Sequence, residues 1–133
     1  MKDDELMARF EDGTLPAELF HHSDHVRVAF LYLCRCPALE ALERFSNSLV
    51  RFAEAKGKPG LYHETITWAF LLLIHERMAR SGVSQTWTQF AAANPDLINW
   101  EKNILWKYYR SETLSSDLAR KIFIFPDKVT AQG

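Results

Sequence analysis

Three histidines and one glutamate, grouped in two short segments, form the pattern in this chain that is best suited to chemistry. The first segment contains His22 and His25, and the second contains His63 and Glu64. Side chains three residues apart are neighbours on a helix face, so His22 and His25 can hold one ion between them. Imidazole nitrogens and carboxylate oxygens are ligands for divalent transition metals such as zinc or iron. The pattern therefore predicts a metal site with His22, His25 and His63 as ligands.

Three further side chains complete the predicted site. Beside a zinc-bound water Glu64 would be the general base, and beside iron it would complete a triad of two histidines and one carboxylate. Arg27 is expected to bind an anionic substrate, or else to form a surface ion pair with Asp24 or Glu64. Tyr62 is expected to contact the substrate as a proton donor, or else to pack as an aromatic ring.

Two hypotheses of function follow from this pattern. The first is a small metal-binding helical protein, which would act as a metalloenzyme if the ion keeps an open position for water or substrate. The second is a non-enzymatic helical binding module, whose histidines form hydrogen bonds within a polar pocket for an aromatic or acidic small molecule. Metal analysis separates the two, because only the first predicts about one equivalent of bound ion.

The hydrophobic spacing predicts an all-α fold that brings the two segments together. Apolar residues recur at helical spacing from about Ser23 to Arg35, from Ala38 to Lys56 and from Tyr62 to Arg80. Short connections make consecutive helices antiparallel, so the first and third of these helices begin at the same end of the bundle. Residues 61–63 include no Ser, Thr, Asp or Asn to cap the third helix. We expect ligation of a metal by His63 to anchor its start instead.

The remaining chain is expected to complete a single domain, residues 1–133, with its core at residues 16–126. Residues 1–13 are expected to be weakly ordered, and the third helix, apolar on nearly every side, to be the buried centre of the bundle. Shorter helices are expected after Ser84, from Asn94 towards Tyr108, and at about residues 115–121. Residues 122–125 have strand propensity but no partner strand, so we expect an extended tail packed over the core.

Composition limits the classes of function and the setting. The formal net charge is −1, so the basic surplus of nucleic-acid-binding proteins is absent. The longest apolar run is far too short to span a membrane, and the polar N-terminus is unlike a secretory signal. Cys34 and Cys36 are too close for an ordinary disulfide, and free thiols indicate a cytoplasmic protein. A small-molecule ligand is the expected partner, and the charge balance leaves room for a homodimer.

Two motifs resemble those of a family of small all-helical bacterial proteins. Residues 20–27 (FHHSDHVR) match the pattern F-x-H-x-x-H-V-R, and residues 60–65 (GLYHET) match G-x-Y-H-E-T. Residues 94–97 (NPDL) and 125–127 (FPD) are similar to further segments of that family. The resemblance implies that the important positions are His22, His25, His63 and Glu64, and it implies no activity. A weaker likeness is to DinB-type metal-binding helical bundles, although no later helix here supplies a spaced pair of histidines.

Overall fold

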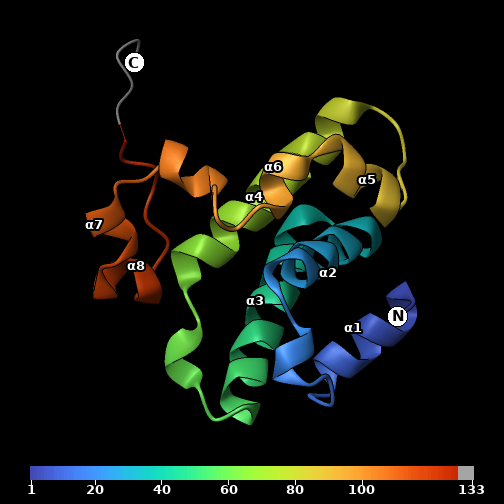
Figure 1. The fold of residues 1–133 in the computed structure, drawn as a ribbon, viewed down its shortest axis with the longest axis horizontal. Helices are drawn as coiled ribbons and strands as arrows, with labels where there is room; N and C mark the ends of the chain where they lie inside the picture. The colour runs from blue at the N-terminus through green and yellow to red at the C-terminus, as the bar shows by residue number, and fades with distance from the viewer. Residues whose placement is uncertain (129–133) are drawn as a thin grey trace.

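Helices make up all of the regular structure in the described part of the chain. The computed structural model describes residues 1–128, and no strand occurs among them. The elements shown in Figure 1 are α1 (Asp3–Glu11), η1 (Ala17–Leu19), α2 (His22–Arg35), α3 (Ala38–Ala55), η2 (Pro59–Leu61), α4 (Glu64–Ser81), α5 (Trp87–Ala93), α6 (Pro95–Ile98), η3 (Ile104–Lys107), α7 (Ser111–Leu114) and α8 (Asp117–Lys121). The predicted all-α class is confirmed. Within residues 1–128, no helix has the length and apolar character that crossing a membrane requires.

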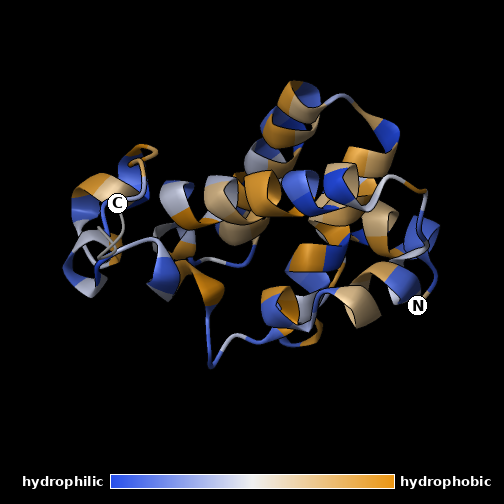
Figure 2. Cartoon of the chain, turned by 90° about the horizontal axis from the view of Figure 1, so that it is seen from above, coloured by the Kyte–Doolittle hydropathy of each residue, from blue (hydrophilic) through white to orange (hydrophobic). Residues whose placement is uncertain are grey.

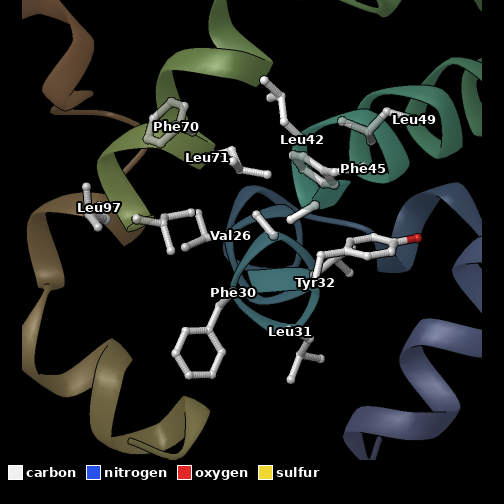
Figure 3. Close-up of a cluster of buried hydrophobic side chains, with 14 of the residues drawn as sticks. Val26, Phe30, Leu31, Tyr32, Leu42, Phe45, Leu49, Phe70, Leu71 and Leu97 are labelled. Atoms are coloured by element: carbon white, nitrogen blue, oxygen red, sulfur yellow. The ribbon is translucent and has the colours of Figure 1, made fainter. Parts of the chain in front are cut away.

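The helices α2, α3 and α4 form the core, and α2 lies among the others. Residues 28–32 of α2 are all buried, and Figure 3 shows Phe30 of α2 extending towards α5, with labelled side chains of α3 and α4 on the other side of α2. We predicted that α4 would be the buried centre of the bundle. However, Leu72 of α4 is 39% exposed. The helix with the most neighbours is α2, which contacts α1, α3, α4, α5 and α6. Hydrophobic and hydrophilic residues alternate around most helices in Figure 2, as expected for helices that pack by one face.

The N-terminal segment forms a docked helix, so the expectation of weak order over residues 1–13 is wrong. Leu6, Met7 and Phe10 on one face of α1 are buried. The Phe10 ring packs against Phe20 and Phe52, with centroid distances of 5.0 and 5.6 Å. Two ion pairs join the acidic first turn of α1 to arginines of α2. Acidic residues are favourable at a helix N-terminus, so the polar start of the chain is compatible with helix.

Hydrogen bonds of Arg77 fix α6 against α4. Its Nη1 and Nη2 atoms donate to the two carboxylate oxygens of Asp96 at 3.1 and 2.7 Å, and Nη1 also donates to Oδ1 of Asn94 at 2.9 Å. The single helix predicted from Asn94 towards Tyr108 is divided into α6 and η3. The side chains of Asn99 and Asn103 accept hydrogen bonds from nearby backbone N–H groups, which compete with helical bonding.

The C-terminal segment after α8 is an extended tail packed along α4, as predicted. The hydroxyl of Thr65 donates to the carbonyl of Ile122 at 2.8 Å and accepts from the backbone N–H of Ile124 at 3.1 Å. The Tyr109 hydroxyl donates to the carbonyl of Ile124 at 2.6 Å. Figure 1 shows α7 and α8 at the end of the molecule opposite to α1. This placement carries α8 to the first turn of α4, where the predicted site lies.

Candidate functional site

The starts of α2 and α4 and the last turns of α3 line one cavity of about 610 Å³. Small-molecule sites in proteins have volumes of about 300–1,000 Å³. His22, His25 and His63 all contribute to its lining, together with Tyr62. Because α2 and α4 begin where α3 ends, the two histidine-bearing segments meet at this end of the bundle.

His63 caps α4 with its own ring. Its Nδ1 atom accepts a hydrogen bond from the backbone N–H of Ile66 at 3.1 Å, and its Nε2 atom lies 2.7 Å from the carbonyl oxygen of Leu114. A carbonyl oxygen can only accept, so Nε2 carries the proton and Nδ1 has none. Burial lowers the pKa of His63 and favours this neutral form. The start of α4 is therefore anchored by a histidine cap, which the search for Ser, Thr, Asp or Asn missed.

His22 is held between α4 and α6. Its Nε2 atom donates to the carbonyl oxygen of Leu97 at 2.9 Å, which leaves Nδ1 as the acceptor of a neutral ring. The ring packs against Phe70 and Trp100, with both centroids at 4.8 Å. Burial lowers the pKa of His22. Residues 94–97, singled out as a motif, thus supply the carbonyl that orients His22.

His25 stacks on Phe20, with ring centroids 4.0 Å apart and an interplanar angle of 17°. Burial, followed by the charge of nearby His22, lowers the pKa of His25 to about 4. All three cavity histidines are therefore shifted towards the neutral form. All three rings are therefore uncharged at neutral pH, and Nδ1 of His22 remains able to accept a hydrogen bond.

The arrangement of these rings does not favour a shared metal ion. His63 uses the lone pair of Nδ1 for Ile66 and the proton of Nε2 for Leu114, so neither nitrogen is free to ligate. Among residues 1–128, no group of three or more His, Cys, Asp or Glu side chains could hold a metal ion. The predicted zinc or iron site stays a prediction, and it would require the His63 ring to leave both hydrogen bonds.

Tyr62 and Glu64 form a hydrogen-bonded pair beside the cavity. The Tyr62 hydroxyl donates to Oε1 of Glu64. Burial and the bond to Glu64 raise the pKa of Tyr62, so its hydroxyl keeps the proton. Tyr62 lines the cavity and Glu64 does not. The structure thus places Tyr62, the predicted substrate-binding residue, at the cavity. Glu64, the predicted general base, is hydrogen-bonded to Tyr62 and does not line the cavity.

Arg27 lies away from the cavity, against α1. Its Nε and Nη2 atoms donate to Oδ1 of Asp3 at 3.0 and 2.7 Å, and Nη2 also donates to the carbonyl of Met1 at 2.8 Å. The structure therefore does not bring this predicted substrate-binding residue to the histidines. Its ion-pair partner is Asp3, which the sequence reasoning had placed in a weakly ordered segment.

Three basic side chains at the cavity were missed by the sequence reasoning. Lys58 and Arg120 are exposed and Lys56 is half-buried, and all three line the cavity. Lys56 donates to the carbonyl of Gly13 at 3.1 Å, and Nη1 of Arg120 donates to the carbonyl of Gly60 at 2.9 Å. The two lysines are close in sequence after α3, but Arg120 joins them only through the packing of α8.

Comparisons with protein-family models, curated proteins and solved structures gave no match. The resemblance of residues 20–27 and 60–65 to a bacterial family therefore stays a prediction. The cavity and the side chains that line it are the features of this molecule that indicate a function.

Proposed function

We propose that this protein is a small-molecule-binding module whose ligand occupies the cavity between α2, α3 and α4. The observation that carries this proposal is a preformed cavity of about 610 Å³, with mostly apolar walls and a few fixed polar groups. Binding sites for small molecules commonly combine these features.

The state of the histidines supports a binding role rather than a catalytic one. His22 and His63 already donate to backbone carbonyls, which fixes the position and tautomer of both rings. Efficient general acid–base catalysis favours a pKa near the working pH, and the pKa of His25 is lowered to about 4. A catalytic role for Glu64 stays a prediction, since its carboxylate is bonded to Tyr62.

A neutral apolar fluorophore tests the proposal directly. N-phenyl-1-naphthylamine should bind with about one equivalent and become more fluorescent as it leaves water. The Ala53→Phe variant, which places a ring at a half-buried position of the cavity wall, should weaken binding at least about tenfold. Ala79→Phe, at an exposed position of α4, should bind like the parent protein. Absence of binding, or equal binding by a folded Ala53→Phe protein, would contradict the proposal.

Metal analysis separates this proposal from the metalloprotein hypothesis. If His22, His25 and His63 hold an ion, the purified protein should contain about one equivalent, and His25→Ala and His63→Ala should lose it. The binding-module proposal expects instead that a chelator leaves the affinity for N-phenyl-1-naphthylamine unchanged. A metal-dependent change in this affinity would favour the metal hypothesis.

A further inference from the structure

The interior of the cavity is suited to an uncharged, apolar part of a ligand. Side chains from three helices form its walls, including Val26 of α2, Leu49 and Phe52 of α3, and Phe70 and Ile74 of α4. All five of these residues are at most 8% exposed. Placing a charge against such walls costs far more than placing a methylene chain or an aromatic ring there.

The rim of the same cavity carries charge of one sign. Lys56, Lys58 and Arg120 line it, and none of the described lining residues is an Asp or a Glu. This local excess of positive charge contrasts with the formal net charge of −1 for the whole chain. A one-signed rim attracts ligands of the opposite charge and holds a charged head in contact with solvent.

The rim cations have no carboxylate partner within the described residues. The ion pairs of residues 1–128 involve other cations: arginines of α2 pair with α1, Arg77 pairs with α6, Arg80 pairs along α4, and His21 lies 3.5 Å from Asp24 at the start of α2. Lys56 and Arg120 donate instead to the neutral carbonyls of Gly13 and Gly60. A carboxylate accepts stronger hydrogen bonds than a neutral carbonyl does, and the guanidinium group of Arg120 can bind it through two nitrogens.

From this division of the cavity we infer that its ligand is an amphipathic acid, with one apolar chain or ring between α2, α3 and α4 and a carboxylate at Lys58 and Arg120. The inference rests on the proposed function and adds the chemical class of the ligand. Lys58 follows α3 and Arg120 belongs to α8, so the carboxylate bridges two parts of the fold that Arg120 already joins through Gly60.

Ligands with the same chain and different heads test the inference. Decanoate and decanol should both displace N-phenyl-1-naphthylamine at about pH 7, with decanoate binding about tenfold more tightly because only its head forms charge-assisted hydrogen bonds. Lengthening the acid from octanoate to decanoate should raise affinity about fourfold for each buried methylene. The preference for decanoate should decrease as salt is added, because the rim is exposed.

Variants of the rim provide the decisive comparison. Lys58→Met with Arg120→Met should bring the decanoate-to-decanol affinity ratio close to one, mainly by weakening the binding of decanoate. Lys121→Met removes one positive charge from the neighbouring, exposed position of α8 outside the cavity and should keep the ratio of the parent protein. Arg120→Lys should retain most of the preference, which would show that the double variant acts through charge. Circular dichroism verifies that each variant is folded.

Each outcome decides one of the two proposals. If decanol and N-phenyl-1-naphthylamine bind but decanoate binds no more tightly than decanol, the binding-module proposal stands and the inference of an amphipathic acid as ligand is wrong. An unchanged ratio in the folded double variant, or tighter binding of decyl phosphate than of decanoate, would also overturn the carboxylate assignment. If none of these ligands binds the parent protein, the proposed function itself fails.

Discussion

The role of His63 is decided by the two atoms that lie next to its ring. A histidine at this position can serve as metal ligand, general base or helix cap, and the residue type alone does not distinguish these roles. The backbone N–H of Ile66 lies 3.1 Å from Nδ1, and the carbonyl of Leu114 lies 2.7 Å from Nε2. The sequence could locate this histidine at the start of a helix. It could not reveal its partner in α7, which is brought there only by folding.

Substitution of His63 should therefore reduce stability rather than metal content. His63→Ala removes the cap of α4 and leaves the buried Leu114 carbonyl without its partner, so we expect a loss of about 2–3 kcal/mol in the free energy of unfolding. His63→Asn should recover about 1 kcal/mol of this, because an asparagine side chain can accept from the Ile66 N–H. Urea denaturation measures both. His75→Ala, at an exposed position of α4, is the control, and equal stability of the Ala and Asn variants would contradict the capping role.

The stacked ring of His25 should make stability depend on pH. The folded-state pKa is about 4, below the ordinary value of 6.5, because the ring is buried and lies near His22. As the pH falls, the unfolded chain takes up this proton first, so stability is lost between about pH 6.5 and pH 4 and no further below that range. The contribution of this one group is roughly 3 kcal/mol.

His25→Phe keeps a ring on Phe20 and removes the titration. Denaturation at about pH 7 and pH 4 should show a smaller loss of stability in this variant than in the parent protein. His22 and His63 have pKa values shifted in the same direction, so part of the acid loss should remain. An identical pH dependence in variant and parent would show that His25 is not buried in its neutral form.

At the scale of elements, apolar spacing is informative for long helices and less so for short ones. It predicted α3 to within one residue at its end and α2 and α4 to within about two residues at their starts. It failed after residue 94, where Asn99 and Asn103 bond to the local backbone and divide the chain. It also failed for α1. The few apolar residues of α1 stabilise this helix only because they pack against other helices.

A substitution in α1 tests whether this helix is part of the core. Phe10 is 1% exposed and packs on Phe20 and Phe52. Phe10→Ala should lower the free energy of unfolding by about 3–5 kcal/mol, as expected for removal of a buried aromatic ring. Leu19→Ala, at a side chain that is 50% exposed, should change it by less than about 0.5 kcal/mol. A mild effect of Phe10→Ala would restore the original expectation of a weakly ordered N-terminus.

At the scale of the whole molecule, the cavity is composed of segments that are distant in sequence. Helix order and short connections were enough to predict that His22, His25 and His63 approach one end of the bundle. The positive rim was not predictable in the same way. Arg120 belongs to a short C-terminal helix, and its approach to Lys58 depends on α8 packing against α4. A tail held by Thr65 and Tyr109 is what brings that helix into place.

Because the cavity exists only in the folded chain, a ligand that fills it should stabilise the whole molecule. The tighter-binding ligand of decanoate and decanol should add about 2.7 kcal/mol to the free energy of unfolding when its concentration is 100 times its Kd. This increase corresponds to a rise in Tm of roughly 10 °C. Calorimetry gives the Kd and the Tm independently, so the rise can be compared with the value that mass action requires. Ala53→Phe should abolish the rise. An equal rise in that variant would show that the ligand binds at another place, and a fall in Tm would show that it binds the unfolded chain instead.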